Sequence, residues 1–461
     1  MNNSIQQSIP AEVAQDYKDS EIIFIGGGPI GLWTAIQTKL LSGRKITVIE
    51  KYHEYKRAEI RLNLSKDSFR GIPKDEQLQN LVKQWGGRQV PIKEMEDALV
   101  KRAEELGIRI LRGYQADAKQ LPEQFPNAEL FIDAGGTRSK TRNDIFGEQF
   151  QFNTTLQYVA QVQYVIEKKP DINPPKSPIH QSFHKITTLA ETYKIQKFAE
   201  HLVEQTIRPL ENGTSRVTLR IFGLDKETYD QMVGATFSTP YYFERDLDKV
   251  PEKLREILIK WWGSQEELNN EVITEDPTNK NKITAIAFGS YASKDAIKMD
   301  EKGNIWALVG DSMEAFPYFR AINNGLKLGT RLAQCVDRAF KNQPKPKTLE
   351  EKKAFFSYLK SYSRYAFTCA YMERIRAYVK NIFINLFSLW LKISNLVPWQ
   401  SVKLKSDQKD NLYQRGEVIW ERLSGTKPPP RGKKSIFTSL KMKKPSFLSS
   451  FFFPNQDLLL S

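Results

Sequence analysis

Residues 25–31 read Ile-Gly-Gly-Gly-Pro-Ile-Gly, and this glycine-rich stretch decides the fold of the 461-residue chain. Residues 21–25, which lead into the glycines, are mostly apolar and predict a short buried strand. A helical pattern over 32–42 follows the glycines, and a second strand is expected at 45–50. The strand, turn, helix and strand have the lengths that a dinucleotide-binding βαβ unit requires.

The turn itself carries the chemistry. Gly26, Gly28 and Gly31 occupy the three positions at which a missing side chain lets the backbone approach a pyrophosphate. The N-terminus of the following helix adds N–H groups and partial positive charge. Glu50, at the end of the second strand, supplies an acceptor where the ribose hydroxyls of an adenosine would lie. This context favours a bound dinucleotide over an ordinary tight turn.

A second polar site is expected nearly three hundred residues downstream. Residues 304–310 predict a buried strand, Asp311 stands at its end, and 325–340 has helical periodicity. The carboxyl ends of parallel strands meet at one edge of a sheet, so Asp311 is expected beside the glycine turn. An aspartate there can hold a ribitol hydroxyl, and a helix N-terminus can stabilise negative charge on a reduced flavin ring. The dinucleotide is therefore expected to be FAD.

The region between these two sites has a different pattern. Residues 149–281 show alternating strands and Pro-rich turns, with a helical pattern at 250–262. We expect an α/β fold with a discontinuous Rossmann-like FAD-binding domain, an inserted, mostly antiparallel β-sheet substrate domain and a C-terminal helical extension. The expected boundaries are 20–148 and 282–341 for the FAD-binding domain, 149–281 for the insert, 348–400 for the C-terminal helical region and 401–461 for a basic, flexible tail.

The positive charge of the chain lies in its last quarter. Residues 1–340 contain 46 Lys and Arg against 46 Asp and Glu, whereas residues 341–461 contain 23 against 8. Three interpretations of this quarter stay open. It is a helical bundle packed on the flavin domain with a solvated tail, or it contacts an anionic membrane through the apolar patch at 382–391 and the basic residues. Nucleic acid is the least favoured partner.

Composition excludes several classes of protein. Hydrophobic residues make up 40% of the chain, which rules out wholesale disorder, and Cys335 and Cys369 are too few for a disulfide framework. No basic and apolar leader is visible before residue 20, so we expect a cytoplasmic protein, peripheral at a membrane in one interpretation; secretion without a cleaved leader stays open. No metal site is expected, because His180 and His184 have no third ligand.

The chain resembles the FAD-dependent monooxygenases of the aromatic-hydroxylase type, which are similar to para-hydroxybenzoate hydroxylase. In local motifs it looks most like the MICAL flavin monooxygenase domain. The resemblance rests on the glycine turn and on four further stretches, 48–51, 90–92, 290–296 and 307–312. It brackets residues 21 to about 340.

The resemblance implies a cofactor, a reductant and a set of binding residues. NADPH would reduce FAD, and O2 would then supply one oxygen atom to a substrate or leak as peroxide. Gly26, Gly28 and Gly31 would hold the pyrophosphate, Glu50 the adenosine ribose and Asp311 the ribitol. The full set expected at the cofactor is Gly26, Gly28, Pro29, Gly31, Glu50, Lys51, Arg57, Gly310, Asp311, Pro317, Arg320, Asn324 and Gly325. No catalytic side chain is assigned.

Two departures from the family pattern bear on activity. Residues 133–136 read Asp-Ala-Gly-Gly, so the acid stands two residues before its usual place, now Gly135. The usual glycines after Pro317 are replaced by Arg320 and Ile322. We expect Arg320 to support the anionic reduced flavin, and the altered segment leaves the choice between NADPH and NADH open.

Two classes of function follow. The first is a monooxygenase whose substrate is a protein side chain, as in MICAL, or by default a small aromatic or lipid-like molecule. The second is a flavin-bound interaction protein, weakly active or inactive, that is recruited to a membrane or an acidic partner.

Overall fold

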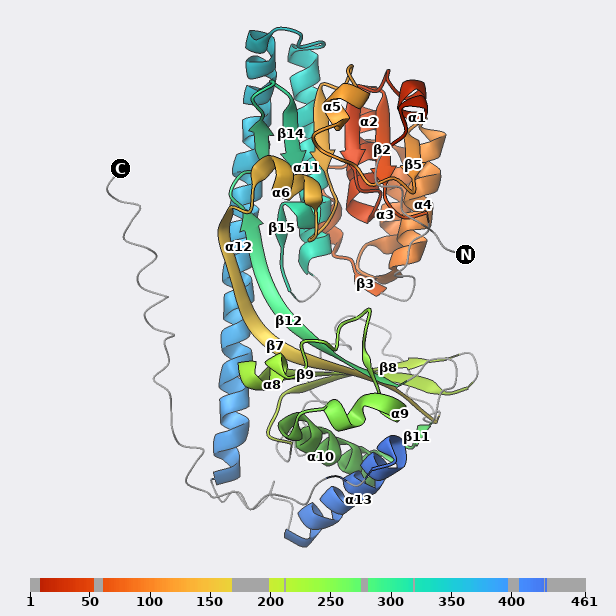
Figure 1. The fold of residues 1–461 in the computed structure, drawn as a ribbon, viewed down its shortest axis with the longest axis vertical. Helices are drawn as coiled ribbons and strands as arrows, with labels where there is room; N and C mark the ends of the chain where they lie inside the picture. Colours follow the sequence, from red (N-terminus) through yellow and green to blue (C-terminus); the bar gives the residue numbers. More distant parts are fainter. Residues whose placement is uncertain are drawn as a thin grey trace, which may run out of the picture.

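The computed structural model describes residues 9–53, 61–167, 199–210, 213–274, 281–317, 320–396, 406–426 and 428. Two sheets organise these residues, one mainly parallel and one antiparallel, and the long helix α12 runs alongside both (Figure 1). The predicted α/β fold class, with a parallel sheet, an antiparallel sheet and C-terminal helices, is confirmed.

The first sheet has six strands in the order β13-β14-β6-β1-β2-β5. Its strands are β1 (Ile22–Ile25), β2 (Ile46–Glu50), β5 (Arg109–Arg112), β6 (Leu130–Asp133), β13 (Ile297–Met299) and β14 (Ile305–Leu308). All neighbours are parallel except β13 and β14. Strands β1, β6 and β14 are buried throughout, as strands covered on both faces are. The sheet therefore joins two stretches of chain that flank the antiparallel sheet.

Short and medium-length helices surround the first sheet, together with a two-stranded β3–β4 ribbon. The bounds are α1 (Ala11–Asp16), α2 (Pro29–Ser42), β3 (Arg61–Asn63), α3 (Glu76–Trp85), β4 (Gln89–Pro91), α4 (Ile92–Glu105), α5 (Leu121–Gln124), α6 (Lys140–Phe146) and α11 (Arg320–Asn342). Single 3-10 turns lie at η1 (Lys66–Phe69), η2 (Leu247–Lys249) and η3 (Gly310–Ser312).

The second sheet has seven strands, built on the order β10-β12-β7-β9-β8, with β11 beside β7 and β15 beside β12. Its elements are β7 (Phe150–Ile166), β8 (Val203–Pro209), β9 (Ser215–Leu224), α8 (Lys226–Asp230), β10 (Tyr241–Tyr242), α9 (Phe243–Asp246), α10 (Glu252–Asn269), β11 (Ile273–Thr274), β12 (Lys282–Ser293) and β15 (Glu314–Ala315). Strand β12 pairs with β7 from Lys282 to Ser293. The boundary expected at 281/282 therefore falls too early, because this pairing holds β12 in the second sheet.

Helix α12 (Leu349–Leu396) ties the two sheets together. Tyr362, fully buried, donates a 2.5 Å hydrogen bond to the carbonyl oxygen of Leu308 in the first sheet. Farther along, Gln157 of β7 donates to the Oδ1 atoms of Asn381 (2.6 Å) and Asn385 (2.9 Å). Asn385 thus interrupts the apolar run at 382–391 because it bonds to the second sheet. Among the described residues, no helix combines the length and apolarity needed to cross a bilayer.

Helix α13 (Ser406–Ser424) corrects the expectation that 401–461 is a flexible tail. Apolar residues at helical spacing bury one face of α13 against α10: Leu412, Tyr413, Ile419, Trp420 and Leu423. The two helices cross at glycines, since a Cβ atom on Gly416 would overlap the carbonyl oxygen of Ile259, and one on Gly263 that of Leu412. Residues 427 and 429–461, the rest of the expected tail, lie outside the described residues.

This crossing can be tested with Gly416→Ala. Alanine is favoured in helices by about 1 kcal/mol over glycine, but overpacking against backbone costs roughly 1–3 kcal/mol. The variant should therefore show a lower free energy of unfolding in denaturant titrations than the native chain. Gly234→Ala is the control, because the nearest atom to its added Cβ is the Tyr241 hydroxyl oxygen at 3.7 Å. A Gly416→Ala variant as stable as the native chain would argue against the docking of α13.

Candidate functional site

The glycine turn lies between the end of β1 and the start of α2. Glycine stands at positions 26, 28 and 31 for different reasons. Gly26 has a φ of +106°, and a Cβ on it would stand 2.5 Å from the carbonyl oxygen of Ala134. A Cβ on Gly31 would overlap the carbonyl oxygen of Gly26. At Gly28 the Cβ position meets no atom within 4 Å. Two glycines therefore serve the protein's own packing, whereas Gly28 borders open space at the helix N-terminus, where an anion is stabilised.

Glu50 lies at the end of β2, where it was predicted, and it is bound to the turn. Its Oε2 accepts a hydrogen bond from the Gly27 N–H at 2.7 Å, and its Oε1 accepts one from the Tyr52 N–H at 3.0 Å. The carboxylate is thus fixed beside the glycines by two backbone donors. Lys51 places its Nζ 4.9 Å from the ring centre of Tyr52. Arg57 lies outside the described residues.

Ile30, inside the turn, is the residue on which the distant segment packs. Gly310 has a φ of +66°, and a Cβ on it would stand 2.9 Å from the Ile30 side chain. A Cβ on Gly325 of α11 would stand 3.0 Å from the same side chain. One helical turn on, Trp33 donates a 3.0 Å hydrogen bond to the carbonyl oxygen of Leu326. The structure therefore brings the two predicted segments together at the carboxyl edge of the parallel sheet.

Asp311 follows Gly310 at this edge and is half-buried. Its backbone carbonyl oxygen accepts a hydrogen bond from the Tyr291 hydroxyl of β12. The Arg142 guanidinium in turn donates to the Tyr291 hydroxyl at 3.1 Å and lies against the rings of Tyr291 and Phe150. Burial raises the pKa of Tyr291 to about 12, so this hydroxyl keeps its proton.

Tyr291 and Arg142 are site residues that the sequence reasoning did not assign. The stretch around Tyr291 was visible only as part of a resemblance, and no local pattern indicates that a strand of the second sheet reaches back to η3. Pairing of Tyr291 with Ala315 in β15 brings it there.

Arg320, at the first residue of α11, is engaged by a neighbour rather than open to the site. Its guanidinium forms a two-point ion pair with the buried carboxylate of Glu373, and Arg376 also donates to Glu373 at 2.6 Å. Burial disfavours the Glu373 carboxylate, but the two guanidinium groups outweigh it and lower its pKa. Its partner on α12 thus compensates the charge of Arg320.

Asn324 and Pro317 lie near Arg320, and both are buried. The Asn324 amide donates to Oε1 of Glu314, while Oε2 of Glu314 has no hydrogen-bond partner among the described residues. Burial, followed by the nearby Glu373 and Asp311 carboxylates, raises the pKa of Glu314 well above its ordinary value. Burial therefore favours the protonated form of Glu314, a residue that was not found from the sequence.

Asp133, the displaced acid, is completely buried at the end of β6. Its Oδ1 accepts from the Gly135 N–H at 2.7 Å, and its Oδ2 accepts from the Ser139 hydroxyl. Burial raises the pKa of Asp133 to about 6, against the opposing effect of these hydrogen bonds. The Asp133 carboxylate is thus occupied in shaping the 134–139 loop, which packs on Gly26.

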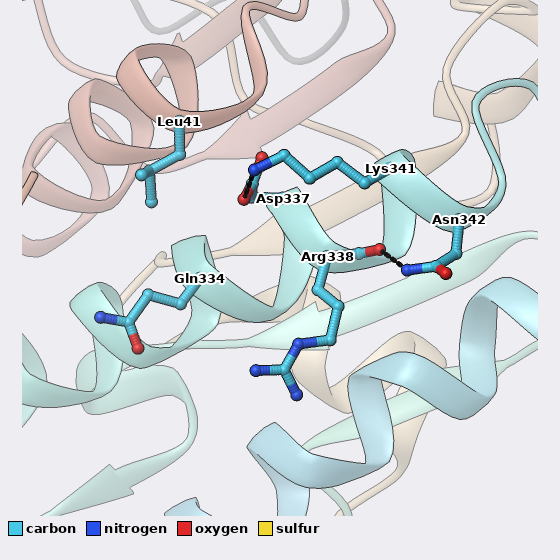
Figure 2. A pocket seen from close by; sticks show the side chains of 6 residues that line it. All are labelled: Leu41, Gln334, Asp337, Arg338, Lys341 and Asn342. Carbon is cyan, nitrogen blue, oxygen red and sulfur yellow. Dashed lines mark hydrogen bonds and ion pairs between the residues drawn. The ribbon is translucent and has the colours of Figure 1, made fainter.

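A separate hollow of about 330 Å³ lies away from the glycine turn, between the C-terminal parts of α2 and α11 (Figure 2). Its polar groups bond largely to one another: Asp337 pairs with Lys341 at 2.7 Å, and Asn342 donates to the carbonyl oxygen of Arg338 at 2.8 Å. None of its lining residues is among those predicted to bind the cofactor. His180 and His184 lie outside the described residues, and the described part of the chain holds no cluster of three potential metal ligands.

Comparisons with known proteins give similarities of fold. No family model matches the chain, and no curated protein does. CabE, an aromatic hydroxylase from angucycline biosynthesis, matches with a TM-score of 0.48 and 14% identity over 88% of this chain and 76% of CabE. The flavin-dependent halogenase CmlS matches with a TM-score of 0.47 and 14% identity over 87% of this chain and 77% of CmlS. CtdE in complex with FAD gives a TM-score of 0.45 and 14% identity over 88% of this chain and all of CtdE. Because the identities are 14% and the TM-scores lie below 0.5, no activity or ligand of these proteins is assigned to this chain.

The buried acid gives a pH prediction. The pKa of Asp133 rises from its ordinary value of 3.8 to about 6 in the folded protein, so the folded state binds the proton more tightly than the unfolded state does. The stabilisation that Asp133 contributes is complete below about pH 4 and is lost as the pH rises to about 6, a change of about 3 kcal/mol. As the pH rises from about 4 to about 6, the free energy of unfolding of the native chain should therefore fall relative to that of the Asp133→Asn variant, as measured by denaturant titrations. Asp97→Asn, at an exposed helix position, is the control substitution. A constant difference between the Asp133→Asn variant and the native chain would contradict the prediction.

Proposed function

We propose that this chain is a FAD-dependent oxidoreductase of the monooxygenase class, which takes electrons from a reduced nicotinamide nucleotide and oxygenates a substrate with O2. The observation that supports the proposal is the contact of Gly310 and Gly325 with Ile30, because it brings the segment that contains Asp311 and the first turns of α11 to the glycine turn. A turn that binds only the adenosine half of a nucleotide does not need this second segment.

The residues present fit FAD. Gly28 leaves room for the pyrophosphate at the α2 N-terminus, Glu50 is oriented by two backbone donors beside it, and Asp311 follows at the same edge. When bound, FAD supplies the electron-transfer and oxygen chemistry. The protein's part is to bind and orient: the Arg142–Tyr291 pair holds the Asp311 backbone, and the Arg320–Glu373 pair fixes the start of α11 on α12.

The finer features of this function are part of the same proposal. NADPH is the proposed reductant, and a protein side chain, as in MICAL-like enzymes, is the proposed substrate. The proposed domains are 20–148 with 294–341 for FAD, and 149–293 for the substrate. The basic C-terminal quarter is proposed to recruit the enzyme to a membrane or an acidic partner.

A second candidate function is a flavin-bound interaction protein without turnover. It is favoured by Asp133, whose carboxylate is buried on Ser139 and the Gly135 N–H and offers no acid at position 135. It is also favoured by the ion pair of Arg320 with Glu373, because we expected this guanidinium to support the reduced flavin.

FAD binding is tested with Gly28→Ala. Its Cβ meets no protein atom, so stability should change by less than about 1 kcal/mol. The same methyl group takes the space of the pyrophosphate, so the dissociation constant for FAD should rise at least about tenfold, or 1.4 kcal/mol, in a flavin fluorescence titration. Gly289→Ala in β12 is the control, because the nearest atom to its Cβ would be the carbonyl oxygen of Thr154 in β7, at 3.5 Å. Unchanged FAD affinity in Gly28→Ala would remove the turn from the cofactor site.

Turnover is tested with the FAD-loaded protein. Without oxygen, NADPH should bleach the flavin absorption, and with oxygen the protein should consume O2 as NADPH is oxidised. Bound flavin with neither response would reject the monooxygenase and favour the interaction protein. NADH in a parallel titration identifies the preferred reductant.

A further inference from the structure

Helix α12 exposes large apolar side chains along one face of its second half. We define the apolar stripe as Ile375, Val379, Phe383, Leu386, Leu389 and Ile393. These side chains are 42% to 67% exposed, and they recur every three or four residues. They therefore line a single helix face about 27 Å long. Soluble surfaces rarely expose a continuous apolar patch of this length without a partner.

The rotation of the helix is fixed, so the stripe cannot turn inward. The opposite face carries the Glu373 ion pair with Arg320 and the Asn381 and Asn385 bonds to Gln157. Ile384 and Leu391 on that face are buried. Because these contacts reach α11 and the second sheet, rotating α12 to bury the stripe against the described residues would break them.

The net charge of the helix segment that carries the stripe is positive. Arg376 and Lys380 are exposed next to it, and Glu373, the one acid in the sequence 371–396, is buried. The sequence 427–444, which lies outside the described residues except for 428, carries seven Lys and Arg and no acid. Apolar and aromatic side chains flanked by cations suit the boundary between headgroups and acyl chains of an anionic bilayer.

A second copy of the chain fits this face less well. Pairing of two stripes would bring two copies of 371–396 together, and this sequence carries four Lys and Arg against one acid, Glu373, so like charges would face each other. Helices that pair through an apolar seam instead place opposite charges along its edges.

We propose that the apolar stripe of α12 docks this protein on an anionic phospholipid bilayer, with the helix lying along the membrane surface. The proposal rests on the recruitment part of the proposed function and is independent of its redox chemistry. Figure 1 shows α12 extending along both sheets, so docking through it holds the whole molecule against the surface.

The test is co-sedimentation of the full chain with vesicles of phosphatidylcholine and phosphatidylserine, with phosphatidylcholine alone as the comparison. The native chain should pellet with the anionic vesicles, and added salt should weaken the binding. The triple variant F383S/L386S/L389S should lose at least about a hundredfold in partitioning, because each large apolar side chain contributes roughly tenfold. The matched control V233S/F237S/V418S changes three apolar residues that are equally exposed elsewhere, and it should bind as the native chain does.

Three outcomes would overturn the proposal. If F383S/L386S/L389S binds vesicles as the native chain does, the stripe is not the membrane contact. The same conclusion follows if vesicle binding is lost only in F451S/F452S/F453S. A native dimer in light scattering that F383S/L386S/L389S dissociates, without vesicle binding, would assign the stripe to a second copy. A flavin titration of each variant shows whether FAD binding is intact, and so distinguishes a loss of vesicle binding from a loss of the cofactor site.

Discussion

The contact of the Ile30 side chain with Gly310 and Gly325 is the constraint on which the rest of the structure depends. It joins α2 to the Gly310 turn and α11, which lie far apart from it in the sequence, and it requires glycine at both positions because a Cβ atom at either would stand 3.0 Å or less from Ile30. Trp33 and Thr34 continue the same approach along α2 against Leu326 and Gly329. The candidate site exists only where these two helices meet.

Buried charge surrounds this meeting point, and each group is stabilised in its own way. Glu373 stays ionised because two arginines bind it, whereas Glu314 and Asp133 lie where burial favours the protonated form. Some of the residues that the sequence motifs assign to the cofactor therefore form contacts that stabilise the fold. Arg320 is the clearest case, since it bridges α11 and α12.

Helix α12 links the two sheets to the outside of the molecule. The polar bonds that seat it on both sheets also determine which of its apolar residues face outward. The same contacts therefore hold the helix on the sheets and leave the stripe exposed. A change in Gln157 or Glu373 would disturb both the frame of the site and the orientation of the stripe.

Local patterns in the sequence determined the strand–glycine–helix unit, the positions of Glu50 and Asp311, the antiparallel strands and the long C-terminal helix, because apolar periodicity and glycine requirements act over a few residues. Tertiary structure alone decided that Tyr291 reaches Asp311, that Arg320 binds Glu373, that β12 belongs wholly to the second sheet and that α13 packs on α10. Each of these depends on partners far apart in the chain, whose approach is set by packing and by the burial of charge. No single stretch of residues contains that information.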